Sequence, residues 1–290
     1  MNCFKKLTCG FWNVGIIDSP VKEVVFSVNQ PKIRWMKHSS RSKFYADPFP
    51  IGEDEDNYYI LAEEYSFFTE KGIIVKLTID KTTFELKKRQ VVIETSFHLS
   101  FPFIYGESIV PEQSKSGKLY SYTNGKEVCI CDYPVIDPVI LKQNGKIYLF
   151  GTMPCSDNKG RNTRLFWYEW NGEKFILKSE SPVKEDIHSS RFAGAFFQID
   201  NTLYRPAQDS EKLYGGQTRI MKVTVDEQGY KEEEIKVLNS HSSDKFNEGF
   251  HTFNIWRNVV IVDGFQNEYR PLLKPFFVLC RIYRKFKTSN

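Results

Sequence analysis

The sequence predicts an all-β fold, a five-bladed β-propeller, on three observations. A chain of 290 residues with 41% hydrophobic and 26% charged side chains can form one large folded domain. Aromatic residues make up 15% of the chain, a share that favours strands. One two-strand pattern recurs five times, and no long helical periodicity interrupts the series.

Each repeat consists of an apolar strand, a polar turn and a second apolar strand. The repeats occupy residues 46–64, 100–112, 136–151, 191–206 and 250–263. Their turns carry hairpin residues, as in Gln143-Asn-Gly145, and further alternating segments such as 72–79 and 218–225 extend most units to three or four strands. Such units at irregular spacing are typical of propeller blades. We expect residues 1–270 to form one domain, with 23–28 joining the last blade to close the ring.

The repeats predict a polar site at the central mouth. In a propeller the inner strand of each blade begins at one face of the channel, and its antiparallel partner returns to that face. Side chains at these two positions should converge, and the candidates are Asp47, Glu64, Glu112, Asp137, Arg191, Arg205, Gln208, Asp209 and His251. Crowded carboxylates raise one another's pKa, which can place an acid beside a base. We therefore expect a sugar site with Asp47, Asp137 and Glu112 as catalytic groups and the other six as binding groups.

The acidic candidates have structural alternatives. An aspartate before proline, as at Asp47 and Asp137, often only caps a turn where a strand begins. Neighbours on a strand point opposite ways, so only one of Glu63 and Glu64 can face the channel, and we expect Glu64. Glu112 can act in the channel or pair with a nearby lysine.

The basic candidates also have two interpretations. Arg191 and Arg205 can clamp backbone carbonyls between blades, or hold a phosphate or carboxylate through the planar guanidinium. His251 can be a satisfied interior imidazole or a ligand group. The segment Tyr214-Gly-Gly216 is too short for a phosphate loop, and we expect a turn there.

The charge distribution argues against a nucleic-acid partner and singles out the last twenty residues. A net charge of +4 is too small for a phosphate-binding surface. Residues 271–290, however, contain five basic side chains, many apolar ones and no acid. Such a tail suits peripheral contact with an anionic membrane, where lipid-linked acceptors reside, or it is a final strand with a frayed basic end.

The N-terminal sequence and the cysteines favour a reducing compartment. Met1 to Gly10 lacks the apolar core of a signal peptide, and no window is long and apolar enough to span a membrane. The six cysteines lack metal-ligand spacing, because one residue separates Cys129 from Cys131. We expect free thiols, no metal site and a cytoplasmic protein that can sit at the inner face of the membrane. No residue pattern names a cofactor.

An ordered series of motifs resembles a known family. The motifs are Ala46-Asp-Pro-Phe49 with Glu63-Glu-Tyr65, Leu99-Ser-Phe-Pro-Phe103 with Val110-Pro-Glu112, Ile136-Asp-Pro138, Arg191-Phe-Ala-Gly194 with Tyr204-Arg-Pro-Ala-Gln-Asp209 and Tyr214-Gly215, and Gly249-Phe-His-Thr252 with Asp263-Gly264. Together they resemble the N-terminal propeller domain of plant glucosamine inositolphosphorylceramide transferases and its stand-alone bacterial relatives. The resemblance runs from about Trp35 to Gly264 and implies a five-bladed ring related to arabinanase-type and xylosidase-type glycosidases.

The resemblance implies roles for two aspartates and leaves three functions open. It places the glycosidase base at Asp47 and the second, substrate-positioning aspartate at Asp137. The glutamate that serves as general acid is replaced near Phe192-Ala-Gly194, so Glu112 would have to supply an acid from another blade. The first function is a glycosyltransferase of surface-glycan assembly, with a sugar or nucleotide-sugar donor and Arg191 and Arg205 on the leaving phosphate. The second is a glycosidase, and the third is a noncatalytic sugar-binding module.

Overall fold

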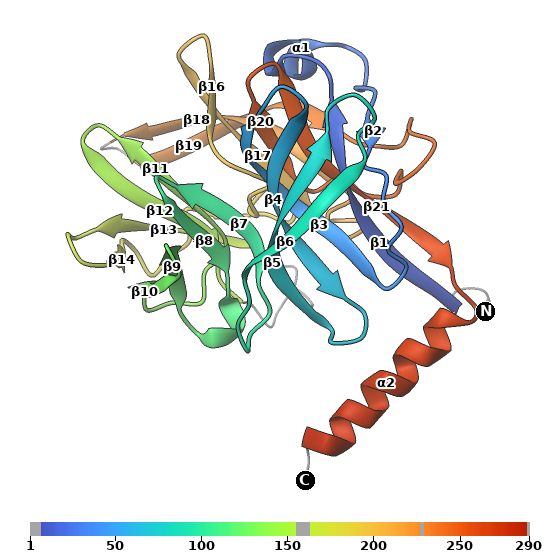
Figure 1. Ribbon diagram of the computed structural model, residues 1–290. Coiled ribbons are helices and arrows are strands. Elements are labelled where there is room, and N and C mark those ends of the chain that lie inside the picture. The colour runs from blue at the N-terminus through green and yellow to red at the C-terminus, as the bar shows by residue number, and fades with distance from the viewer. Residues whose placement is uncertain (1–6, 155–162, 227–228, 289–290) are drawn as a thin grey trace.

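The computed structural model describes residues 7–154, 163–226 and 229–288. Five antiparallel sheets surround a central axis and form a five-bladed β-propeller, which confirms the predicted class (Figure 1). Blade one contains β3 (Lys43–Glu53), β4 (Asn57–Ser66), β5 (Lys71–Asp80) and β6 (Leu86–Ile93). Blade two contains β7 (Ser100–Tyr105), β8 (Ser108–Glu112), β9 (Leu119–Thr123) and β10 (Lys126–Cys131), with the 3-10 helix η2 (Ser114–Ser116) between β8 and β9.

The remaining blades follow in chain order. Blade three contains β11 (Ile136–Gln143), β12 (Lys146–Thr152), β13 (Arg164–Trp170) and β14 (Phe175–Leu177), and β15 (Lys184–Glu185) also pairs with β13. Blade four contains β16 (Phe197–Ile199), β17 (Thr202–Asp209), β18 (Gln217–Asp226) and β19 (Gly229–Leu238). Blade five contains β20 (Phe253–Trp256), β21 (Val259–Tyr269), β1 (Thr8–Ile17) and β2 (Arg34–Trp35). The five predicted hairpins are thus the inner two strands of the five blades.

The ring closes through the N-terminal strand. β1 pairs with β21 from Thr8 opposite Tyr269 to Ile17 opposite Val260. The prediction that residues 23–28 close the ring was wrong, because Pro20 precedes a short helix, α1 (Val21–Phe26), whose Val24 and Val25 are buried. Both ends of the propeller therefore belong to the same blade.

A bulge recurs at the start of three inner strands. The strand register shifts at this point in β3, β7 and β11. Asp47, Phe101 and Asp137 lie at the shift with φ angles of 51°, 45° and 49°, and each precedes a proline. A left-handed residue in a bulge re-aims its side chain, and non-glycine residues adopt this conformation rarely. The bulge points the first and third of these side chains toward the axis.

The interior is apolar and rich in phenylalanine. Phe101, Phe150 and Phe192 are fully buried in the largest core cluster, which joins blades one to four. Each such ring contributes about 1.5–3 kcal/mol of burial free energy. This packing between neighbouring sheets gives the central site a rigid frame.

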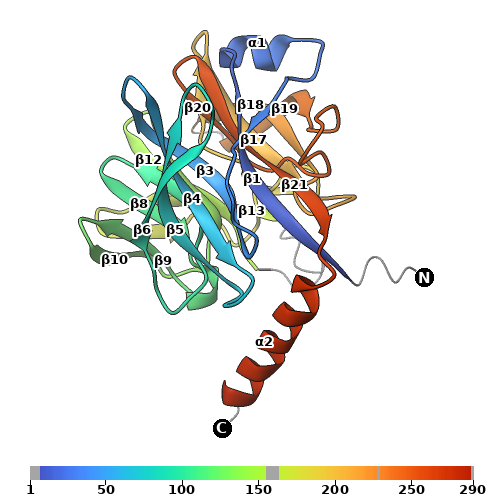
Figure 2. The same cartoon turned by 45° about the vertical axis from the view of Figure 1, so that its right-hand side comes forward.

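Residues 273–288 form a helix, so the interpretation of the tail as a final strand was wrong. Helix α2 (Leu273–Thr288) leaves the ring after β21 and projects beyond it (Figures 1 and 2). Pro275 lies in the first turn, where a missing N–H is tolerated. No helix in the described part of the chain is long and apolar enough to cross a membrane.

Four cysteines in the described ranges are free thiols, as expected: Cys9, Cys129, Cys131 and Cys280. Cys3 and Cys155 lie outside the described residues.

Candidate functional site

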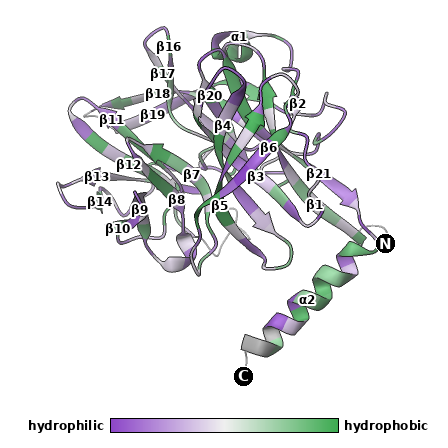
Figure 3. Ribbon diagram, viewed as in Figure 1, coloured by the Kyte–Doolittle hydropathy of each residue, from purple (hydrophilic) through white to green (hydrophobic). Residues whose placement is uncertain are grey.

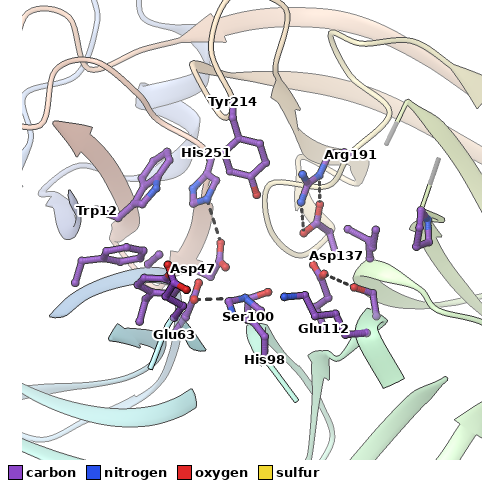
Figure 4. A pocket seen from close by; sticks show the side chains of 18 residues that line it. Trp12, Asp47, Glu63, His98, Ser100, Glu112, Asp137, Arg191, Tyr214 and His251 are labelled. Atoms are coloured by element: carbon purple, nitrogen blue, oxygen red, sulfur yellow. Dashed lines mark hydrogen bonds and ion pairs between the residues drawn. The ribbon is translucent and has the colours of Figure 1, made fainter. Parts of the chain in front are cut away.

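The central mouth holds a pocket of about 980 Å³. It is lined by Trp12, Phe44, Ala46, Asp47, Glu63, Tyr65, Glu70, His98, Ser100, Glu112, Ser114, Lys115, Ile136, Asp137, Pro154, Arg191, Tyr214 and His251 (Figure 4). These residues come from all five blades and from the connections between them. The structure thus brings together five of the nine predicted site residues, namely Asp47, Glu112, Asp137, Arg191 and His251.

Asp47 is held by neighbouring blades on both sides. Its Oδ2 accepts the Phe101 backbone N–H at 3.1 Å, and its Oδ1 accepts the Thr252 hydroxyl at 3.0 Å. Burial raises the pKa of Asp47 to about 6, although His251 partly offsets this effect, while Asp263 adds to it. Asp47 therefore titrates near neutrality in a fixed orientation.

His251 lies between an aspartate and an aromatic ring. Its Nδ1 is 2.8 Å from Asp263 Oδ1, so Nδ1 carries the proton, and its ring stacks on Trp12 with centroids 3.8 Å apart. Burial lowers the pKa of His251, but Asp263 and Asp47 outweigh burial and raise the pKa above its usual value. Nε2 lies 3.6 Å from Asp47 Oδ1. His251 can thus carry a positive charge beside the candidate base.

Glu63 is a buried acid with few hydrogen bonds or nearby cations to stabilise its charged form. Its Oε1 has no hydrogen-bond partner among the described residues. Burial, followed by the charges of Asp47 and Glu112, raises the pKa of Glu63 well above its usual value. His98 Nδ1 accepts the Gly72 N–H at 2.9 Å, so the neutral ring carries its proton on Nε2, 3.5 Å from Glu63 Oε1. Burial and the neighbouring acids thus favour the protonated form of Glu63, which can donate a hydrogen bond.

Glu112 and the Asp137–Arg191 pair form the opposite wall. Glu112 accepts the Ser114 hydroxyl at 2.9 Å, and burial together with Asp137 raises the pKa of Glu112 to about 7, against the opposing effect of Arg191. Arg191 donates through Nε and a terminal nitrogen to the two oxygens of Asp137, at 2.7 and 3.0 Å. The guanidinium carbon also lies 5.0 Å from the centre of the Tyr214 ring. This wall combines an acid that titrates near neutrality with a fixed ion pair.

The expectation that Glu64 faces the channel was wrong. Glu64 accepts hydrogen bonds from Lys43 at 2.8 Å and from Arg89 at 2.7 and 2.6 Å, on the side of β4 opposite the pocket. Burial would raise its pKa, but Arg89 and Lys43 lower it overall. Strand alternation held, but its phase places Glu63 in the pocket instead.

Arg205, Gln208 and Asp209 do not line the pocket either, so the prediction that they face the central mouth was wrong. Arg205 pairs with Glu232 at 2.7 Å. Asp209 pairs with Arg219 at 2.7 Å. Gln208 donates to Asp137 Oδ2 at 3.2 Å and thus supports the lining from behind. The side chains at the end of β17 therefore form ion pairs and hydrogen bonds with other parts of the protein and do not face the pocket.

Thirteen of the eighteen lining residues had not been predicted as site residues, among them Trp12, Glu63, His98, Ser100 and Tyr214. Tyr214 precedes Gly215, whose φ is 60° and where a Cβ would lie 2.5 Å from the His251 Cβ. The glycine lets this turn approach His251 and carries Tyr214 over the pocket. Tyr214-Gly215 was one of the family motifs and was expected to form a turn, but Tyr214 itself was not predicted as a site residue.

Asp47, His251 and Asp263 offer ligand atoms within 4.8 Å of one another. A cation there would need free lone pairs. The Asp263 carboxylate already accepts the backbone N–H groups of Asp47, His251 and Thr252 at 3.0, 3.2 and 2.9 Å, and His251 Nδ1 donates to it as well. The donor set therefore fits a hydrogen-bonded network that fixes Asp47 better than it fits a metal site.

The chain is similar to known proteins over most of its length. The family model described as "Glucosamine inositolphosphorylceramide transferase 1, N-terminal" matches residues 13–259. Glucosamine inositolphosphorylceramide transferase 1 of Oryza sativa subsp. japonica is 27% identical over 214 residues, which cover 66% of this chain and 28% of the rice protein. The protein of that name from Oryza sativa subsp. indica is 27% identical over 218 residues, with the same coverage. The match thus spans little more than a quarter of the curated relatives.

The chain also has similar solved structures, but their sequence identity is lower than that of the rice proteins. Zg3597, a family 117 glycoside hydrolase from Zobellia galactanivorans, is 13% identical with a TM-score of 0.46, covering 81% of this chain and 89% of that chain. The α-L-arabinanase of Cellvibrio cellulosa is 12% identical with a TM-score of 0.46, covering 70% and 84%. Because the family model matches from β1 to the start of β21, this chain belongs to the family of the N-terminal domain of glucosamine inositolphosphorylceramide transferase 1.

Proposed function

We propose that this chain is a glycosyltransferase-type enzyme of glycan assembly that transfers a sugar to a hydroxyl acceptor in the central pocket. The observation that carries the proposal is the meeting of the buried Asp47 and the half-buried Glu112, with pKa values of about 6 and 7, in one pocket. General acid–base groups work best when their pKa lies near the working pH. The rings of Trp12, Phe44 and Tyr65 in the lining suit stacking on a sugar face.

The pocket residues divide the proposed chemistry among them. Asp47 in its ionised form takes the proton of the acceptor hydroxyl, whose oxygen attacks the anomeric carbon of the donor. The bond from that carbon to the leaving phosphate oxygen breaks, and its electron pair goes to the phosphate. Asp137, fixed by Arg191, orients the sugar, and Glu63 and Glu112 form hydrogen bonds with its hydroxyl groups.

The binding of the leaving phosphate changes from the expectation drawn from the sequence. Arg205 cannot contact it, because that side chain is fully buried outside the pocket. Arg191 and Lys115 line the pocket. Asp137 pairs with Arg191, whereas no carboxylate of the described residues pairs with Lys115. Arg191 and Lys115 are therefore the groups that we assign to a phosphate.

Hydrolysis is the second candidate function, and a specific observation favours it. Glycoside hydrolysis needs one protonated and one ionised carboxyl group across the anomeric carbon. Between pH 6 and pH 7 the pKa values of Glu112 and Asp47 supply that combination. Water would then replace the acceptor hydroxyl at Asp47.

A noncatalytic sugar-binding role is the third candidate. It is favoured by the partial coverage of the rice proteins, in which 28% of the length matches this chain. The pocket would then bind a glycan while another protein supplies the chemistry.

Incubation with panels of nucleotide sugars and of aryl glycosides tests the three functions. Nucleotide release that requires an added acceptor supports transfer, and free sugar from glycosides supports hydrolysis. Saturable binding without turnover supports the recognition role. Glu63→Gln and Glu64→Gln are matched variants, because only the first residue lines the pocket. If both variants affect binding or turnover equally, the central pocket is not the site.

A further inference from the structure

Helix α2 is fastened to the propeller along one face. Phe277 stacks on Phe67 with ring centroids 5.1 Å apart and joins a small core with Phe11 and Leu273. Arg284 pairs with Glu70 at 3.2 Å, and Arg281 also pairs with Glu70. The helix is thus attached to the turn between β4 and β5.

The opposite face of α2 is apolar and exposed to solvent. Leu272, just before the helix, and Phe276, Leu279, Tyr283 and Phe286 are 86%, 52%, 63%, 69% and 70% exposed, although one edge of the Phe276 ring also contacts Phe68. Their spacing of four, three, four and three residues forms one stripe along the helix, which we call the outer stripe. Figure 3 shows the hydrophobic colouring along α2 outside the propeller. An exposed apolar stripe of this extent marks a contact surface.

The charge of this segment identifies the kind of surface. Six of the 40 basic residues and none of the 36 acidic residues lie in 270–290. The rest of the chain, with 34 basic and 36 acidic residues, is slightly acidic. Basic side chains beside an apolar helical stripe are attracted to anionic lipid headgroups while the stripe enters the acyl boundary.

The attachment point of α2 is part of the pocket rim. Glu70, which both arginines of α2 contact, lines the central pocket, as does Phe44, which packs on the same small core as Phe277. The sixteen residues of the helix make it about 24 Å long. In Figures 1 and 2 it projects beyond the face of the ring on which the turn between β4 and β5 lies.

We infer that α2 is an interfacial helix that docks the pocket-bearing face of the propeller onto an anionic lipid bilayer. The acceptor of the proposed transfer is then lipid-linked, a part of the inference that rests on the proposed function. A second copy of the chain fits the stripe less well. Two such helices would bring only like charges together, whereas paired helices use acidic partners beside their seam.

Vesicle flotation of the full chain tests the inference. Vesicles of phosphatidylcholine with phosphatidylglycerol should carry the protein, vesicles of phosphatidylcholine alone should not, and high salt should weaken the binding. The stripe variant Leu272→Ser, Leu279→Ser, Phe286→Ser should reduce the fraction that floats by about tenfold. The matched control Val28→Ser, Val128→Ser, Ile176→Ser removes three apolar side chains that are 95%, 57% and 51% exposed elsewhere, and it should float like the original chain.

Further readouts separate this inference from the pocket chemistry. Asp47→Asn should float normally, and the stripe variant should keep turnover or binding of soluble ligands in the pocket. Equal flotation of the stripe variant and the original chain would overturn the inference. So would a chain that does not float but dimerises in analytical ultracentrifugation through the same stripe.

Discussion

The central pocket and the Arg205 cluster both contain charged groups, but the pKa values of their acids are shifted in opposite directions. The Arg205 cluster comprises Arg205, Glu232 and Lys184, where β17, β19 and β15 meet. Burial alone would raise the pKa of Glu232, but Arg205 and Lys184 hold it at about 2. In the pocket the pKa values of Asp47 and Glu112 are raised to about 6 and 7.

The difference shows which buried charges stabilise the fold. In the Arg205 cluster every charge has a partner, so the side chains lock neighbouring strands together. In the pocket the acids outnumber the cations, so the fold tolerates a cost in free energy to keep protons available. Unfavourable electrostatics concentrated in one cavity are typical of functional sites.

The largest expected effect comes from Asp47→Asn. Loss of the general base should lower turnover by at least about 100-fold. The melting temperature should fall by no more than a few degrees, because the substitution also removes a desolvated carboxylate whose pKa is raised. Steady-state kinetics and calorimetry measure the two effects. Full activity in this variant would remove Asp47 from the mechanism.

Arg205→Met should lower stability strongly and leave the pocket intact, the reverse of Asp47→Asn. It leaves Glu232 buried without its main partner, which costs about 3–5 kcal/mol of unfolding free energy. Residual folded protein should keep its pocket affinity, because Arg205 does not line the pocket. Urea denaturation and ligand titration provide the measurements. A stable variant with an empty or inactive pocket would contradict the structural role.

The pair Glu63→Gln and Glu64→Gln compares adjacent residues on β4. Glu64→Gln should lower the unfolding free energy by about 1–3 kcal/mol, because charge-assisted hydrogen bonds to Lys43 and Arg89 are lost. Glu63→Gln should leave stability at neutral pH unchanged or raised, because it removes an acid whose pKa is raised by burial. Denaturation at pH 7 distinguishes them. A larger loss from Glu63→Gln would mean that its carboxyl group is satisfied in the folded protein.

A further expected effect is a slope in stability against pH. Asp47 and Glu112 have folded pKa values of about 6 and 7 against ordinary values of 3.8 and 4.5. Between about pH 4 and pH 7 the folded state therefore binds more protons than the unfolded state, and the unfolding free energy should fall as pH rises. The raised pKa of His251 acts in the same direction above its unfolded value. The double variant Asp47→Asn, Glu112→Gln should flatten this slope in denaturant melts, and an unchanged slope would refute the assignment.

Sequence reasoning identified the repeat and the positions from which the site is built. Hairpin turns and strand alternation are local signals, and the Asp-Pro pairs at Asp47 and Asp137 mark equivalent bulges in two blades. Glu112, Arg191 and His251 followed from their places at strand ends. The pocket was therefore largely predictable wherever local pattern and repeat symmetry coincide.

The errors arose where side-chain partners or strand pairing on other strands decide the outcome. Arg205 and Asp209 occupy equivalent strand-end positions, but Glu232 and Arg219 from neighbouring strands capture them. Ring closure by β1 depends on pairing with residues some 250 positions later, which no local pattern reveals. The phase of β4, which decides between Glu63 and Glu64, depends on the bulge in β3 opposite to it.

The pairing of β1 with β21 has a consequence for biosynthesis. During synthesis β1 leaves the ribosome long before β21, so β1 lacks its partner strand until β21 has also emerged. Trp12 on β1 stacks on His251, and Asp263 on β21 fixes both His251 and the backbone of Asp47. The pocket lining is therefore complete only after β21 has been synthesised and has paired with β1.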